Sequence, residues 1–185
     1  SNGLSVNDIV IENNNSIKAM INLYSIDIKE EKYYDALKII DRILQTEKSL
    51  DSVKKDKAFV CLKLNNLSVS KKICADFLLI NKNDITSLNI LGLCYIAEDK
   101  HEEAIKIFNE VLNYDKKNLS ALNSLGRIYH EKRESKKAEQ FFKKALLVDV
   151  NSYHVLNNIA GFYREEGRYN EGINYYLKAL VEGSL

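Results

Sequence analysis

The chain of 185 residues has no proline, no tryptophan, only seven glycines and only three cysteines. Without proline, no residue forces a helix to end by removing a backbone donor, so other residues must set the helix ends. Three cysteines without regular spacing argue against a disulfide framework. We expect Cys61, Cys74 and Cys94 to be buried free thiols, which favours a reducing, cytoplasmic location.

Long apolar runs and an excess of charge are also lacking. The longest apolar segments, such as residues 145–148, fall far below the roughly 18 residues that a membrane span needs. The opening residues lack the basic start and apolar core of a signal peptide. Lysine and arginine number 27 and acidic residues 26, a formal net charge of +1, so the chain has no continuous basic stripe. We therefore expect neither a membrane nor a nucleic-acid partner.

Residue patterns that carry chemistry are absent as well. The sequence contains no phosphate-binding loop, no nucleophile elbow and no paired metal-ligand spacing. His101, His130 and His154 fall at unrelated positions, and the acidic run around His101 is typical of a helix start. These observations predict that the chain is not an enzyme and needs neither a cofactor nor a metal.

What the sequence does contain is a fixed period of 34 residues. Segment 119–152 shows the unit: two amphipathic stripes, each with helical spacing, joined by a polar run at 130–137. This pattern predicts a helical hairpin. Five columns keep the period: Leu88, Leu122 and Leu156; Gly92, Gly126 and Ala160; Tyr95, Tyr129 and Tyr163; Ala104, Ala138 and Gly172; Phe108, Phe142 and Tyr176.

Gly126 lies inside the first helix of its hairpin, where glycine costs about 1 kcal/mol relative to alanine. Close packing of the two helices is the simplest reason, and Ala138 and Ala145 offer clearance on the second helix. The first helices are predicted near 17–29, 52–64, 85–97, 119–131 and 153–165. Residues suited to N-caps stand just before four of them: Ser16, Asp84, Asn118 and Ser152.

The period, the columns of small residues, the tyrosine that closes the first helix and the aromatic residue in the second resemble the tetratricopeptide repeat family. The resemblance implies an all-α, right-handed solenoid, a superhelix of antiparallel helix pairs. Lys54 and Ser70 depart from the pattern by replacing a leucine and an alanine in the second, degenerate repeat. The predicted boundaries are a leader or remnant of a preceding repeat at 1–16, then repeats at 17–50, 51–84, 85–118, 119–152 and 153–185.

In proteins similar to this one, the first helices line a concave groove, and the second, fifth, ninth and twelfth positions of each repeat point into it. The resemblance therefore implies a scaffold that binds a peptide segment of a partner protein. The candidate groove residues are Lys55, Phe59, Asn89, Leu93, Ile96, Asn123, Arg127, His130, Asn157 and Arg164.

Each kind of groove residue suggests a role. The column Asn89, Asn123 and Asn157 can donate to and accept from a peptide backbone. Arg127 and Arg164 suit bidentate capture of a carboxylate, so we expect an acidic or C-terminal segment as ligand. Apolar side chains of the ligand would pack on Phe59, Leu93 and Ile96. The alternative is that the arginines are simply solvated or pair within the chain with Glu131 and Glu165.

Other functions remain open from the sequence. The carboxylate clamp of chaperone-tail adaptors is disfavoured, because Lys55 fits that pattern but Phe59, Ile90, Ser120 and Ser124 do not. The second candidate function is a regulatory or targeting module of a larger enzyme, such as a glycosyltransferase. The third is RNA binding, which the period of 34 disfavours.

No polar capping helix follows the fifth repeat in the sequence. We therefore expect either self-association through the exposed apolar end of that repeat, or a segment of a longer protein.

Overall fold

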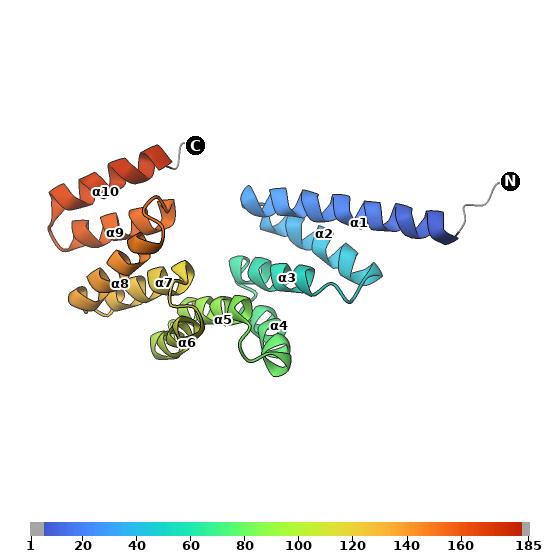
Figure 1. The fold of residues 1–185 in the computed structure, drawn as a ribbon, viewed down its shortest axis with the longest axis horizontal. Helices are drawn as coiled ribbons and strands as arrows, with labels where there is room; N and C mark the ends of the chain where they lie inside the picture. The colour runs from blue at the N-terminus through green and yellow to red at the C-terminus, as the bar shows by residue number, and fades with distance from the viewer. Residues whose placement is uncertain (1–5, 183–185) are drawn as a thin grey trace. The chain divides into compact units, whose positions relative to one another are not determined.

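The computed structural model describes residues 6–182, and the side chains of residues 16–181. This part of the chain forms ten α-helices and no strand (Figure 1), so the prediction of an all-α repeat solenoid is confirmed. None of these helices combines the length and apolar character needed to cross a bilayer. The helices are α1 (Val6–Lys29), α2 (Tyr33–Thr46), α3 (Asp51–Lys63), α4 (Leu67–Ile80), α5 (Ile85–Ala97), α6 (His101–Tyr114), α7 (Leu119–Glu131), α8 (Ser135–Val148), α9 (Tyr153–Glu165) and α10 (Tyr169–Glu182).

The helices belong to two compact units, divided between Lys82 and Asn83. Unit 1 contains the hairpins α1–α2 and α3–α4, and α2 also packs against α3. Unit 2 contains the hairpins α5–α6, α7–α8 and α9–α10, stacked in chain order. The first helices of unit 2 also touch one another, α5 with α7 and α7 with α9, so they line one face of that unit.

The turn inside each described hairpin contains one residue in the left-handed region, and these residues recur every 34 positions. They are Glu31 (φ 59°), Asn65 (60°), Asp99 (59°), Arg133 (62°) and Gly167 (76°). The backbone N–H of the residue that follows donates a hydrogen bond to a backbone carbonyl near the end of the preceding helix. Lys32 donates to Asp27 at 2.7 Å in this way, and Glu134 donates to Tyr129 at 2.8 Å. This bond is typical of a Schellman motif, and it ends the first helices without proline.

The predicted N-caps are partly correct. Asp84 accepts from the backbone of Ser87 at 2.8 Å, and Asn118 accepts from that of Ala121 at 3.1 Å. The prediction is wrong for Ser152, whose side chain makes no capping bond, although its backbone still occupies the cap position. It is also wrong for Ser16, which lies inside α1.

Helix α1 begins at Val6, ten residues before Ser16, because no glycine or proline interrupts this stretch. The sequence also allowed Val6, Ile9 and Val10 to be the tail of a preceding repeat, but their side chains lie outside the described ones. Residues 1–5 of the expected leader lie outside the described residues altogether.

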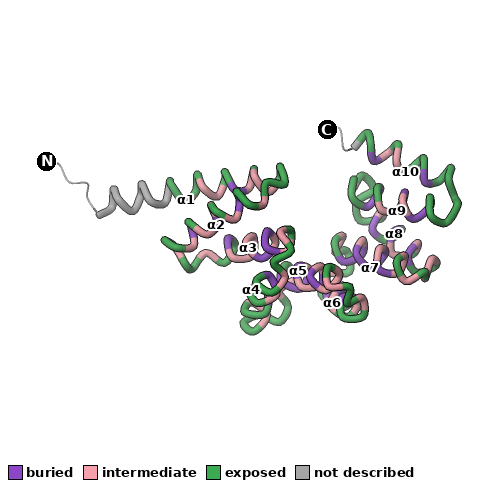
Figure 2. The backbone as a smooth tube through the Cα atoms, turned by 180° about the vertical axis from the view of Figure 1, so that it is seen from behind, coloured by how far each residue is buried: buried purple, intermediate pink, exposed green. Residues whose placement is uncertain are grey.

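Buried residues follow the predicted columns. In Figure 2 they are the purple stretches, which recur along the helices of both units. The leucine column of unit 2 is at most 3% exposed. Unit 1 has its own core, formed by Tyr24, Ala36, Ile40, Ile43, Val53 and Val60. The three cysteines are buried thiols outside any disulfide, as predicted.

Close packing explains the helical glycines. A Cβ atom on Gly126 would lie 2.7 Å from the ring of Phe142, and one on Gly92 would lie 2.6 Å from the ring of Phe108. The predicted close approach is therefore confirmed, but the neighbour is the aromatic ring of the second helix rather than its alanines.

Candidate functional site

Helices α7 and α9 bring four of the predicted groove residues to one pocket in unit 2, with a volume of about 250 Å³. Arg127 and His130 come from α7, whereas Asn157 and Arg164 come from α9. The lining is mainly polar. The other residues that line the pocket are Glu131, Phe142, Asn158, Gly161, Phe162, Glu165 and Tyr176.

Each arginine of this pocket has a glutamate within reach. The guanidinium of Arg127 lies 3.9 Å from Glu131, and that of Arg164 lies 3.7 Å from Glu165. Both arginines therefore lie near the glutamates that the sequence offered as their alternative partners, and their charges are partly compensated within the chain. Both contacts are long, and the arginine side chains are 44% and 60% exposed, so their donors remain accessible to a ligand.

His130 lies at the buried edge of the pocket. Its ring packs edge-on against Phe162, with centroids 5.3 Å apart. Its Nε2 is buried and lies 3.2 Å from a carboxylate oxygen of Glu165, yet it makes no hydrogen bond. Buried polar atoms usually have a partner, so this nitrogen is unused hydrogen-bonding capacity beside the pocket.

The three asparagines of the predicted column differ in their contacts. Asn89 donates to the Oδ1 of Asn118 at 3.2 Å, so it supports the cap of α7. Asn123 accepts from Asn158 at 3.0 Å, which links α7 to α9. Asn157 is exposed and makes no hydrogen bond within the described part of the chain. Of the three, Asn157 is the one whose whole amide is available to a ligand.

The remaining predicted groove residues lie elsewhere. Leu93 and Ile96 are half-buried on α5. Phe59 is on α3 in unit 1, where it packs against the core and meets the ring of Tyr33 edge-on at 6.5 Å. Lys55, also on α3, holds its ammonium group 4.9 Å from the ring centre of Phe77. None of these four lines the polar pocket of unit 2.

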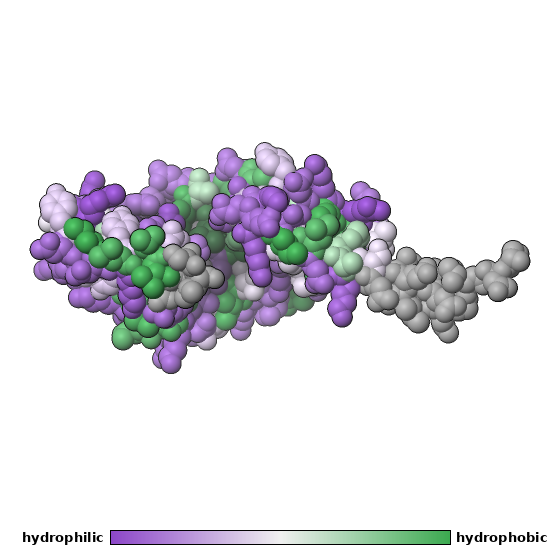
Figure 3. Space-filling view, turned by 90° about the horizontal axis from the view of Figure 1, so that it is seen from above, coloured by the Kyte–Doolittle hydropathy of each residue, from purple (hydrophilic) through white to green (hydrophobic). Residues whose placement is uncertain are grey.

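Two features of the site were missed from the sequence. Asn158 lines the pocket and holds Asn123, and its only signal was its place beside Asn157. The second is an apolar cavity of about 330 Å³ on α9 and α10, which shares Asn157 and Tyr176 with the polar pocket. Apolar side chains lie exposed along α10 (Figure 3), including Leu177 at 58% and Leu180 at 66%.

The chemistry of the polar pocket is that of recognition. Guanidinium donors, an exposed amide and a buried imidazole can hold a carboxylate and a peptide backbone. Within residues 16–181, no three or more His, Cys, Asp or Glu side chains are grouped so that they could hold a metal ion.

Models of the tetratricopeptide repeat match the sequence at residues 84–147 and at residues 153–180. The chain is a tetratricopeptide repeat protein. A search of curated proteins gave no match. Because tetratricopeptide repeats generally mediate protein interactions, the family suggests a protein–protein interaction scaffold.

Solved structures with a similar fold include the tetratricopeptide repeat protein TTC0263 of Thermus thermophilus, with a TM-score of 0.79 and 19% identity over 91% of this chain and 90% of that one. The PilF protein of Pseudomonas aeruginosa has a TM-score of 0.68 and 17% identity, over 91% of this chain and 77% of its own. MamA from residue 41 onward, from Desulfovibrio magneticus RS-1, has a TM-score of 0.62 and 12% identity, over 91% and 95%. At these identities the likeness concerns the fold alone.

Proposed function

We propose that this tetratricopeptide repeat protein binds a segment of a partner protein on the face formed by α5, α7 and α9. The polar pocket of Arg127, His130, Asn157 and Arg164 is the point that selects the ligand. The observation that supports this proposal is that these four residues, chosen from the repeat pattern, line one open pocket. The buried cysteines, which form no disulfide, support a location in the reducing cytoplasm.

An acidic side chain or a C-terminal carboxylate is the ligand group that fits this pocket. The contacts of Arg127 with Glu131 and of Arg164 with Glu165 are long, so an incoming carboxylate competes for the guanidinium groups at little cost. A bidentate contact would then replace a loose one. Asn157 can hold the backbone of the ligand, while Leu93 and Ile96 offer apolar surface on α5.

The experiment compares proteins retained from a lysate of the source organism by three forms of the chain. One is the wild type, and one is the double variant Arg127→Gln and Arg164→Gln. The third is a control, Lys116→Gln and Lys117→Gln, which removes the same charge from an exposed turn outside the pocket. Circular dichroism first establishes that all three are equally helical and stable.

A partner retained by the wild type and the control but lost with the arginine variant supports the proposal. Its binding segment, made as a peptide, should then lose about tenfold or more in affinity for the arginine variant in calorimetry. If the arginine variant retains the same proteins as the wild type, the pocket does not select the partner and the proposal is wrong.

A second candidate function is self-association through α10. Residue Leu146 of α8 packs into the core beside α9, whereas its counterpart Leu180 of α10 is 66% exposed. Ile173 and Leu177 extend the same apolar surface, at 54% and 58% exposed. Two copies of α10 can cover each other's apolar side chains in a twofold arrangement.

Sedimentation over a range of protein concentrations tests this candidate. The wild type should shift from monomer to dimer as the concentration rises, and Leu177→Glu with Leu180→Glu should remain monomeric. A wild type that stays monomeric at millimolar concentration would exclude self-association through this surface.

A further inference from the structure

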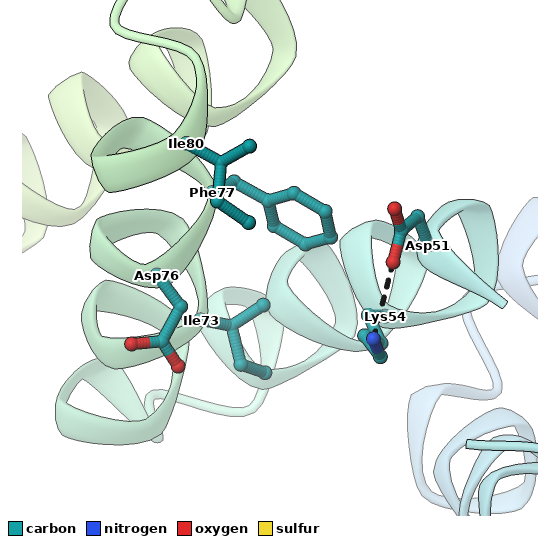
Figure 4. Close-up of a pocket in the computed structure, with 6 residues that line it drawn as sticks. All are labelled: Asp51, Lys54, Ile73, Asp76, Phe77 and Ile80. Atoms are coloured by element: carbon teal, nitrogen blue, oxygen red, sulfur yellow. Dashed lines mark hydrogen bonds and ion pairs between the residues drawn. The ribbon is translucent and has the colours of Figure 1, made fainter. Parts of the chain in front are cut away.

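Unit 1 contains a separate pocket between α3 and α4, with a volume of about 200 Å³. Asp51 and Lys54 of α3 form one wall. The opposite wall comes from α4, and in Figure 4 the side chains of Phe77 and Ile73 point from α4 toward α3. The remaining lining residues are Asp76 and Ile80, so the whole pocket belongs to unit 1.

The pocket exists because α3 departs from the repeat pattern. Lys54 stands where the following repeats have the buried leucines Leu88, Leu122 and Leu156. Its ammonium group turns to Asp51 at 3.1 Å instead of filling the space between the helices. Asp51 likewise replaces an apolar residue, since its counterparts are Ile85, Leu119 and Tyr153. Both substitutions remove apolar burial, and departures of this kind from a consistent pattern are expected at functional sites.

The α4 wall is apolar and accessible to solvent. Ile80 is 87% exposed, and Phe77 and Ile73 are half-buried. The pocket volume is large enough for one large apolar side chain of a partner. Binding of such a side chain against Ile73, Phe77 and Ile80 is favourable, because it removes apolar surface of both partners from water.

Some charged side chains around the pocket have a partner within the described part of the chain, whereas one does not. Lys54 is held by Asp51, and Lys55 lies over the ring of Phe77 at 4.9 Å. Asp76 is exposed and pairs with no cation within residues 16–181. The uncompensated charge at the rim is therefore negative, which favours a cationic neighbour beside the apolar side chain.

We propose that the α3–α4 pocket binds a partner polypeptide through an apolar side chain adjacent to a lysine or arginine. The apolar side chain lies against Ile73, Phe77 and Ile80, and the cation pairs with Asp76. This site is distinct from the polar pocket of unit 2, whose expected ligand is acidic, and it does not depend on that proposal.

The test selects binders from a random twelve-residue peptide library displayed on phage. Selection uses the full wild-type chain and discards phage that bind the variant Lys54→Leu, which restores the leucine of the other repeats and fills the pocket. Lys72→Leu is the matched control, because it makes the same replacement at an exposed position of α4 that does not line the pocket. Melting curves establish that both variants fold.

Enriched peptides should share an apolar residue next to arginine or lysine. Made as free peptides, they should lose about tenfold in affinity for Lys54→Leu and bind Lys72→Leu like the wild type. Asp76→Asn should weaken them about two- to fivefold, an effect that disappears when the basic residue of the peptide is replaced by glutamine. The variant Arg127→Gln with Arg164→Gln should bind them normally, which separates this site from the polar pocket.

Three results would overturn the proposal: no enriched motif, an acidic motif, or equal binding to the wild type and to Lys54→Leu. Loss of binding to the arginine variant would assign the peptides to unit 2 and equally contradict it.

Discussion

Gly126 on α7 faces Phe142 on α8 so closely that a methyl group at residue 126 would lie 2.7 Å from the ring. The same relationship joins Gly92 to Phe108 in the preceding hairpin. Gly161 is also inside a first helix, but a methyl group there would have only the hydroxyl of Tyr176 nearby, at 3.7 Å. Glycine is therefore required at residue 126 by packing, whereas residue 161 has room for a side chain.

Replacing Gly126 or Gly161 by alanine should change the stability of the fold in opposite directions. Gly126→Ala forces α7 away from Phe142 and should lower the free energy of unfolding by about 1–3 kcal/mol. Gly161→Ala gains helix propensity without a clash and should raise it by about 1 kcal/mol. Urea unfolding followed by circular dichroism measures both. Equal effects of the two substitutions would show that α7 and α8 do not need this close approach.

Left-handed residues at the hairpin turns predict a second pair of opposite effects. Glu31 adopts φ 59° with a full side chain, so Glu31→Gly should stabilise the chain by about 1 kcal/mol. Gly167, with φ 76°, should show the reverse, a loss of similar size on Gly167→Ala. The melting temperatures of these two variants, measured by thermal unfolding, check this prediction. Asn65→Gly is the comparison: asparagine tolerates the left-handed conformation, so this substitution should stabilise the chain less than Glu31→Gly does. Stabilisation by all three substitutions would contradict the assigned turn geometry.

Tyr163 predicts a loss of stability at alkaline pH. Burial, and then its hydrogen bond to Glu139 at 2.9 Å, raise the pKa of Tyr163 well above its ordinary range. Because the unfolded chain releases this proton first, the stabilisation is complete below the ordinary tyrosine pKa of about 10 and is lost as pH rises above it. Tyr163→Phe should therefore flatten the fall in unfolding free energy above about pH 10. Tyr34→Phe, at a side chain 73% exposed, is the control and should leave the curve unchanged.

Glu139 predicts a loss of stability in acid. Its pKa is lowered by the hydrogen bond from Lys143 and, further, by those from Tyr163 and Arg168, although burial opposes the shift. The carboxylate therefore stabilises the fold above the ordinary glutamate pKa of about 4.3, and this contribution is lost as pH falls through the lowered folded pKa. Glu139→Gln should be less stable than the wild type at pH 7 and approach it near pH 3. Glu103→Gln, at an exposed side chain, should show no such convergence.

Much of the fold follows from local pattern. The first helices predicted at 85–97, 119–131 and 153–165 agree with α5, α7 and α9, and α3 differs by one residue at each end. These limits depend on the 34-residue period and on capping residues such as Asp84 and Asn118, which act within a few positions along the chain. The prediction fails at α1, where the period and the cap type of Ser16 suggested a start at residue 17 and no breaking residue imposes one.

The candidate site follows from the sequence less completely. The four residues of the polar pocket could be proposed from the repeat pattern because α7 and α9 present the same repeat positions to one face of unit 2. The pairing of the two arginines with Glu131 and Glu165 was open from the sequence, because each pair lies within one helix. The bond from Asn158 to Asn123 was not predictable, since it joins α9 to α7 and depends on stacking of the hairpins in unit 2. Asn89 and Asn123, equivalent in the pattern, therefore differ in their contacts.

The sequence by itself determined the helices, the repeat and the residues that each helix buries, because hydrophobic periodicity acts along a single helix. Only the tertiary structure decided the bond from Asn158 to Asn123, the approach of His130 to Glu165 and the pocket beside Lys54. These features depend on how one helix lies against the next. Residues a full repeat apart meet only once the hairpins pack, and no pattern within a single helix records that contact.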